Sequence, residues 1–135
     1  MHRTVIFSTL FALMMVWGGP PRAQAQSLSP MKADIVTFGA QGAGRIHLRN
    51  PYKSARRFTV SVFDENWHQV KGARLSNSRL ALAPGATTSV FVVVPLKQDR
   101  SKTFYLCATS YPFYGRGTGM KGEVCGKYRI IRRHL

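Results

Sequence analysis

Short runs of alternating apolar and polar residues, separated by turn residues, fill the chain beyond residue 25 and constrain its fold more than any other feature. In the run Gly44–Arg49, Ile46 and Leu48 face one way and basic residues face the other, as in a strand with one buried and one wet face. No segment in this region has helical periodicity. The pattern predicts strands at Ala33–Phe38, Gly44–Arg49, Phe58–Asp64, within Ala73–Leu82, and at Thr87–Val94, Phe104–Thr109 and Val124–Arg132.

The number and spacing of these runs predict an all-β domain spanning residues 26–135. About seven short strands with frequent turns are typical of an immunoglobulin-like sandwich of two sheets. A small closed barrel is the alternative. The run Thr87–Val94 is the most β-branched, and we expect it at the centre of a sheet.

The first 25 residues have the pattern of a signal peptide. A short basic start precedes an apolar run of about 14 residues, and Ala23-Gln24-Ala25 matches a cleavage site. A membrane anchor is the alternative, but it needs roughly 20 apolar residues. We therefore expect a periplasmic or secreted protein whose mature chain has no transmembrane segment.

The chain has two cysteines, Cys107 and Cys125. In an exported protein such a pair predicts one disulfide. A metal pair or a redox site has no support, because there is no C-x-x-C motif and the histidines are scattered. We expect neither a cofactor nor a bound metal.

The chain is strongly basic, with 20 lysines and arginines against five acidic residues and a net charge of +15. This charge favours an anionic partner. For an exported protein, an envelope polymer, an acidic protein surface or a membrane face is a better expectation than nucleic acid. The alternative is that the charge only keeps a small domain soluble.

Sequence motifs of enzymes are missing from the chain. It has no nucleophile elbow, no H-E-x-x-H motif and no separated pair of carboxylates in an apolar context. The adjacent Asp64 and Glu65 are typical of a solvated turn. We therefore expect a protein that is not an enzyme.

Three short motifs occur in a suggestive order. Asn50 ends a basic strand, Leu82-Ala83-Pro84-Gly85 forms a turn before the β-branched run, and Asp99-Arg100 precedes Phe104-Tyr105. This order resembles the N-terminal, immunoglobulin-like domain of periplasmic pilus-assembly chaperones. The resemblance covers nearly all of residues 26–135. It implies a non-catalytic protein that binds a β-rich pilus or surface subunit by edge-strand pairing.

The resemblance also implies a site for a carboxylate. In that family, a basic residue on the first strand and another near the end of the last strand hold the terminal carboxylate of the subunit. The matching positions here are Lys32 and Arg129. Some members also carry a disulfide between the last two strands, where Cys107 and Cys125 lie.

Two further groups of residues are candidates for binding. Lys127, Arg132 and Arg133 form a predicted basic edge, which either binds a ligand or prevents aggregation between sheets. A glycine-rich, aromatic and cationic loop before Cys125 is a candidate binding loop, with the alternative that its aromatic side chains cover the end of the core. Its members are Tyr114, Arg116, Met120 and Lys121.

Two functions are consistent with these features. The first is a chaperone-like or accessory binding module in the assembly of pili or other surface structures. The second is a cationic envelope-binding protein that holds an anionic cell-surface polymer. Salt separates them, because polymer binding weakens steeply with ionic strength and apolar strand addition does not.

Overall fold

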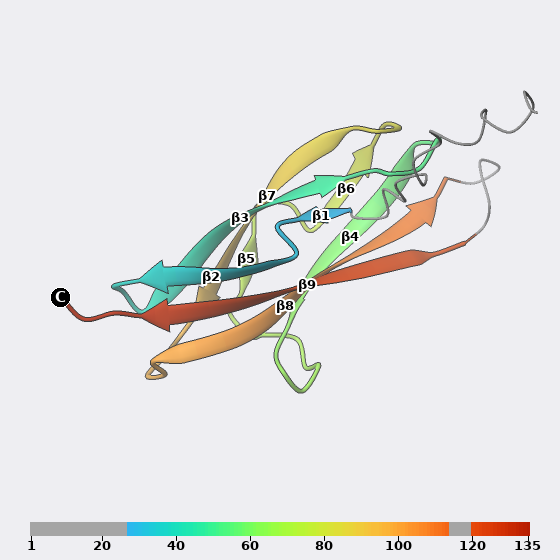
Figure 1. Ribbon diagram of the computed structural model, residues 1–135. Coiled ribbons are helices and arrows are strands. Elements are labelled where there is room, and N and C mark those ends of the chain that lie inside the picture. Colours follow the sequence, from blue (N-terminus) through green and yellow to red (C-terminus); the bar gives the residue numbers. More distant parts are fainter. Residues whose placement is uncertain (1–26, 114–119) are drawn as a thin grey trace, which may run out of the picture.

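The structure is a computed structural model that describes residues 27–113 and 120–135. These residues form nine β-strands in two sheets (Figure 1). The two sheets confirm the predicted all-β sandwich, and the closed barrel was wrong. Within the described ranges, no helix is long and apolar enough to cross a membrane.

The two sheets differ in size and in strand direction. Every neighbouring pair is antiparallel except β2 and β9, which run parallel. The four-stranded sheet has the order β1 (Leu28–Ser29), β3 (Gln41–Arg49), β7 (Thr87–Pro95) and β5 (Arg74–Leu75). The five-stranded sheet has the order β2 (Lys32–Thr37), β9 (Gly122–Arg132), β8 (Ser101–Pro112), β4 (Arg56–Phe63) and β6 (Arg79–Leu82).

The region before Gly44, predicted as a turn, is part of strand β3. A Cβ atom at Gly42 would overlap the side chain of Ile130, and one at Gly44 would overlap Ile35. Glycine therefore lets the backbone of β3 lie close to the opposite sheet. The predicted strand began only at Gly44 and left Gly42 in a turn, because a stretch with few side chains shows no alternation.

The region Ala73–Leu82 contains two strands instead of the predicted one. Strands β5 and β6 lie in different sheets, and the polar residues 76–78 connect them across the edge of the sandwich. The run Thr87–Val94 lies in β7, between β3 and β5. This agrees with the predicted central position, although Phe91 on its outer face is half exposed.

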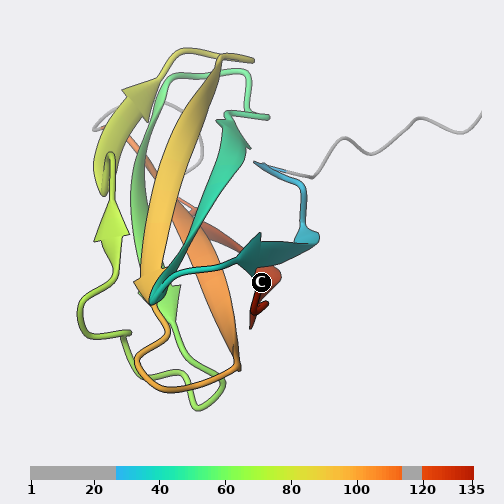
Figure 2. The ribbon, with the colours of Figure 1, turned by 90° about the vertical axis from the view of Figure 1, so that its left-hand side faces the viewer.

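The N-terminal strand divides between the two sheets. Strand β1 pairs with β3, and the chain then turns at Pro30 and Met31 into β2, which pairs with β9 (Figure 2). The Tyr128 hydroxyl donates a hydrogen bond to the Pro30 carbonyl (2.6 Å), and the Lys127 N–H donates one to the Met31 carbonyl (2.8 Å). Burial raises the pKa of Tyr128 to about 12, which keeps the phenol protonated as a donor.

The core lies between the two sheets and takes alternate residues from each strand. The rings of Phe104 and Tyr128 stack with their centroids 5.4 Å apart. The fully buried apolar side chains include Leu28, Ile46, Leu48, Val90, Val92, Val94, Leu96, Phe104, Leu106 and Ile130. The outer faces of both sheets are left to polar and charged side chains and a few exposed aromatic ones.

Two of the sequence motifs meet in the structure. Asn50 is fully buried, and its side-chain amide donates hydrogen bonds to the carbonyls of Leu82 (3.0 Å) and Ala83 (3.2 Å). The Gly85 N–H in turn donates to the Asn50 carbonyl (2.9 Å). Gly85 has a φ of 71°, a conformation that favours glycine. Asn50 thus anchors the turn that precedes β7.

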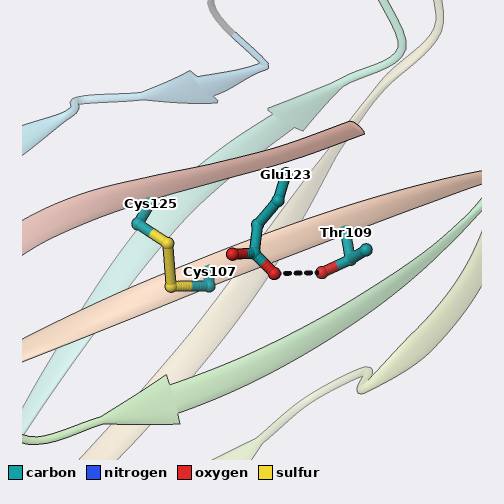
Figure 3. Close-up of a disulfide and its surroundings, with 4 residues drawn as sticks. All are labelled: Cys107, Thr109, Glu123 and Cys125. Atoms are coloured by element: carbon teal, nitrogen blue, oxygen red, sulfur yellow. Dashed lines mark hydrogen bonds between the residues drawn. A yellow bond between two sulfur atoms is a disulfide. The ribbon is translucent and has the colours of Figure 1, made fainter. Parts of the chain in front are cut away.

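The predicted disulfide is present. Cys107 on β8 and Cys125 on β9 are direct register partners, with their Cα atoms 4.0 Å apart (Figure 3). The next outward-facing pair toward the loop is Thr109 and Glu123, whose side chains share a 2.9 Å hydrogen bond. Two consecutive cross-links therefore join β8 to the first half of β9.

Replacing both cysteines by alanine (Cys107→Ala with Cys125→Ala) should lower the free energy of unfolding by about 3 kcal/mol, because the open chain gains loop entropy when unfolded. Urea unfolding followed by circular dichroism measures this. The reduced natural protein should show a comparable loss, and Thr109→Val, which removes only the adjacent hydrogen bond, should cost about 1 kcal/mol. An unchanged urea midpoint in the double variant would contradict the expectation.

Candidate functional site

Strand β9 has one half covered and one half open. Strand β8 pairs with it from Gly122 to Ile131, whereas β2 covers only Lys127–Arg132. Among the residues that the structure describes, no strand pairs with Gly122–Gly126 on the side away from β8. This open segment therefore presents unpaired backbone groups to an added strand.

A groove of about 280 Å³ opens between the sheets beside this segment. Tyr52 lines one wall and the first residues of β9 line the other. The full lining is Ser27, Pro51, Tyr52, Phe58, Ala108, Ser110, Gly122, Glu123 and Val124. A strand added along Gly122–Gly126 would point every second side chain toward this groove.

The glycines of the open segment have a packing role. A Cβ atom at Gly122 would overlap the Tyr52 hydroxyl, and one at Gly126 would overlap the Tyr128 hydroxyl. The sequence predicted a loop here, but Gly122 already belongs to β9. The Val124 side chain packs against the core of this domain, so it is not available to insert into a partner protein.

Arg56 closes the end of the sandwich near the groove, and no pattern in the sequence indicated this role. Its guanidinium is fully buried, lies 3.9 Å from the centre of the Tyr52 ring and donates to the Met120 carbonyl. Its Nε has no hydrogen-bond partner among the residues that the structure describes. The side chain is planar and always charged, which suits it to stacking on an aromatic ring. It joins β4 to the residues that lead into β9.

The two predicted carboxylate-binding residues lie close together, on the outer face of the five-stranded sheet. Lys32 on β2 is the register partner of Lys127 on β9, and Asp34 is the partner of Arg129. Their side chains line a shallow hollow of about 320 Å³, together with Ala33, Thr103 and Tyr128. The topology therefore brings Lys127, which was assigned from the sequence to a basic edge, next to the two cations assigned to the carboxylate site.

Arg129 already holds a carboxylate from its own chain. Its Nε and Nη2 donate to the two carboxylate oxygens of Asp34, at 3.2 Å and 2.7 Å. The hydrogen bond from Arg129 lowers the pKa of Asp34, and Asp34 raises the pKa of Arg129. Both side chains are about half exposed, so water screens the pair and an external carboxylate has access to it.

The predicted basic edge is not an edge. Lys127 and Arg132 lie on β9 where β2 covers it. Arg132 donates to the carbonyls of Gly39 (3.1 Å) and Lys97 (2.7 Å) and so joins two turns. Arg133 follows β9 and is exposed.

The candidate binding loop is only partly described. Tyr114 and Arg116 lie outside the described residues. Met120 is exposed, and the Lys121 ammonium lies 5.6 Å from the centre of the Tyr111 ring. These residues precede β9, whereas Arg129 lies near its other end, so the structure does not join the loop to the hollow.

Sequence reasoning also missed an aromatic cluster on the same outer face. Trp67 is 57% exposed, and its ring stacks on Tyr105 with centroids 4.6 Å apart. Phe63 lies 6.1 Å from Trp67, and the Lys127 ammonium lies 5.8 Å from the Tyr105 ring. A turn of five residues carries no periodic signal that could reveal such packing.

Asp64 sets the position of Trp67. Its Oδ1 accepts hydrogen bonds from the N–H groups of Asn66 (2.8 Å) and His68 (2.9 Å), and its carbonyl accepts one from Trp67 (3.1 Å). Within this turn Trp67 has a φ of 61°, unusual for a bulky residue. The turn therefore holds the indole against the sheet.

Comparisons with known proteins bear on the fold alone. No protein-family model matches the chain, and no curated protein matches it. Among solved structures, it is similar to the E. coli chaperone DraB, with a TM-score of 0.65 and 11% identity over 78% of this chain and 54% of that one. A Salmonella enterica SafA pilin in complex with the SafB chaperone gives a TM-score of 0.62 and 12% identity over 78% and 53%.

A third similar structure is a PapD-like domain of human CEP192, with a TM-score of 0.63 and 12% identity over 98% of this chain and 99% of that domain. The chain spans about half the length of the two bacterial chains. At such identities the similarity establishes the architecture alone: an immunoglobulin-like sandwich. Function has to come from the site itself.

Removing the Asp64 carboxylate should release Trp67 from Tyr105. Asp64→Ala should shift the emission of Trp67 to the red and lower its anisotropy, whereas Asp64→Asn, which keeps the acceptor oxygen, should resemble the natural protein. Fluorescence of the chain from Gln26 onward, where Trp67 is the single tryptophan, measures both. Equal spectra for the alanine variant and the natural protein would contradict the assigned role.

Acid should have a related effect. Hydrogen bonding from the His68 N–H lowers the pKa of Asp64 below its usual 3.8. Its stabilising contribution is therefore complete above pH 3.8 and is lost as the pH falls through the folded-state pKa. The natural protein should show the red shift only below about pH 3.8, and Asp64→Asn should lack this transition. The charged groups near Asp64 are His68 and Lys102.

Proposed function

We propose that this protein is a non-catalytic, chaperone-like binding domain that recognises a β-rich pilus or surface subunit by pairing with its strand. The observation that carries the proposal is the open segment Gly122–Gly126 beside the groove between the sheets. The solved chaperones with this architecture, one of them in complex with a pilin, support it. The predicted signal peptide at residues 1–25 and the disulfide fit a periplasmic or secreted protein.

Strand addition follows from the geometry of the open segment. The incoming strand would occupy the same side of β9 as β2 and end where β2 begins, opposite Lys127. If it ran parallel to β9, its terminal carboxylate would lie next to Lys32. A partner strand parallel to β9 would therefore direct its C-terminus toward the cationic hollow.

Lys32, Lys127 and Arg129 would hold that carboxylate. A carboxylate removed from water needs charged donors, and these three residues supply them on neighbouring strands. In the absence of a partner, the Asp34 carboxylate forms an ion pair with the Arg129 guanidinium. The incoming carboxylate would either displace Asp34 or bind between the two lysines.

The alternative function, binding of an anionic envelope polymer, is supported by the net charge of +15 alone. A pull-down with the tagged protein from the periplasm, after mild crosslinking and washing in high salt, separates the two functions. Mass spectrometry should identify a stoichiometric β-rich subunit that is lost in Arg129→Gln and retained in Arg133→Gln, a control with the same loss of charge.

Release of an anionic glycan by salt, with no protein captured, would overturn the proposal and leave the polymer alternative. If Arg129→Gln captures the subunit to the same extent as the natural protein, the proposed carboxylate anchor is wrong and the proposed strand pairing stands.

Asp34 should act as a competitor of the external carboxylate. Asp34→Asn frees Arg129, so affinity for a carboxylate should rise by up to about fivefold. Arg129→Gln should lower the affinity, because it removes a donor and leaves Asp34 unpaired. NMR titration with N-acetyl-trialanine, observed at the Arg129 Nε–H and at the backbone of β2 and β9, measures this. Equal affinities for Asp34→Asn and the natural protein would show that Arg129 does not bind the ligand.

A further inference from the structure

A single row of side chains crosses the outer face of the five-stranded sheet. Strand register aligns Phe63 on β4, Tyr105 on β8, Lys127 on β9 and Lys32 on β2. Trp67 stacks on Tyr105 from the turn after β4. The row starts at an exposed indole and ends in the cationic hollow.

The aromatic end of this row does not belong to the core. Tyr105 and Phe63 alternate with buried neighbours and face outward, and Trp67 is 57% exposed. Three hydrogen bonds to Asp64 hold the turn in a conformation that is costly for tryptophan. Exposed, rigidly held tryptophan and tyrosine side chains are the groups that dominate binding at protein interfaces.

Charge is concentrated at one end of the row. Lys32 and Lys127 lie at the β2 end with Arg129 beside them. At the β4 end, Asp64 and Glu65 lie in the turn that carries Trp67, and Lys102 and His68 are near Asp64. A ligand that complements this pattern has a carboxylate at one end and a neutral aromatic or large apolar side chain at the other.

We propose that this row, Trp67–Tyr105–Lys127–Lys32, is a docking surface for a protein segment that carries a carboxylate and, at a fixed distance, an aromatic side chain. The carboxylate binds between the two lysines and the aromatic ring stacks on the open face of Trp67. The inference rests on the proposed function, because the cationic hollow is shared. The residues before a strand-paired carboxylate would lie along Gly122–Gly126, so the segment that crosses to Trp67 is a different segment of the partner, and it adds a specificity element that strand pairing does not supply.

The sheet geometry sets the distance between the two groups. The carboxylate lies between β2 and β9, and the Trp67 ring lies over Tyr105 on β8 beside Phe63 on β4. At roughly 4.8 Å per strand spacing, the two groups are about 7 to 12 Å apart. An extended peptide advances about 3.3 Å per residue, so the aromatic residue is about two to four residues from the carboxylate.

Synthetic peptides test this on the chain from Gln26 onward, which contains both sheets. Each probe is an acetylated Gly/Ser peptide with one phenylalanine placed one, four or eight residues before a free C-terminal carboxylate. The quenching or shift of Trp67 fluorescence measures the affinity, with NMR as a second readout. The spacing of four should bind best, and its C-terminal amide should bind about tenfold more weakly.

Variants locate the contact. Trp67→Ala should weaken binding of the four-residue probe about fivefold to tenfold, as read by NMR. Phe91→Ala removes a comparably exposed aromatic residue from the other sheet and should have no effect. Lys127→Gln should weaken binding, and Lys71→Gln should not. Circular dichroism confirms that each variant is folded, and Trp67→Phe should retain most of the affinity.

Several results would overturn the inference: no binding of any probe, equal affinity at all three spacings, or equal losses in Trp67→Ala and Phe91→Ala. Competition by polygalacturonate that depends on Trp67 would also overturn it, since the ligand would then be an acidic glycan. If Trp67→Ala still captures the β-rich subunit in full while Arg129→Gln does not, this inference fails and the proposed function stands. If the natural protein captures no subunit, the proposed function fails, whatever the peptides show.

Discussion

The turn of the N-terminal strand at Pro30 and Met31 determines most of this architecture. Before this turn the N-terminal strand pairs with β3 in one sheet, and after it the strand pairs with β9 in the other. Hydrogen bonds from the Tyr128 hydroxyl and from the Lys127 backbone hold the turn in place. Because β2 begins only after this turn, it covers the second half of β9 and leaves Gly122–Gly126 open. The open segment, the groove and the start of the cationic hollow all follow from where that crossing occurs.

The outer face of the five-stranded sheet is organised in rows of register partners with different roles. One row holds the disulfide, and the next toward the loop holds the hydrogen bond between Thr109 and Glu123. On the other side of the disulfide are the row with Tyr105 and Lys127 and then the row with Arg129. The covalent link thus stiffens the strand pair next to the charged and aromatic rows. This is consistent with a surface that has to keep its side chains in register for a partner.

Three of the five acidic residues have defined structural tasks. Asp34 pairs with Arg129, Asp64 holds the turn around Trp67, and Glu123 accepts a hydrogen bond from Thr109. The similar solved structures share about a tenth of their residues with this chain, so the architecture tolerates very different surfaces. An account of binding therefore has to rest on these local contacts.

The sequence by itself determined the all-β class, the approximate strands, the disulfide and the turn before β7, because alternation, the presence of two cysteines in a chain with a predicted signal peptide, and Pro-Gly turns can be recognised without a structure. It also selected Lys32 and Arg129 through a family resemblance. Only the tertiary structure decided that Asp34 faces Arg129, that β2 covers half of β9 and that Trp67 lies on Tyr105. These contacts join residues far apart in the chain or depend on a turn without periodicity. They arise because both sheets must bury their inner faces together, which sets the register of strands that the sequence leaves independent.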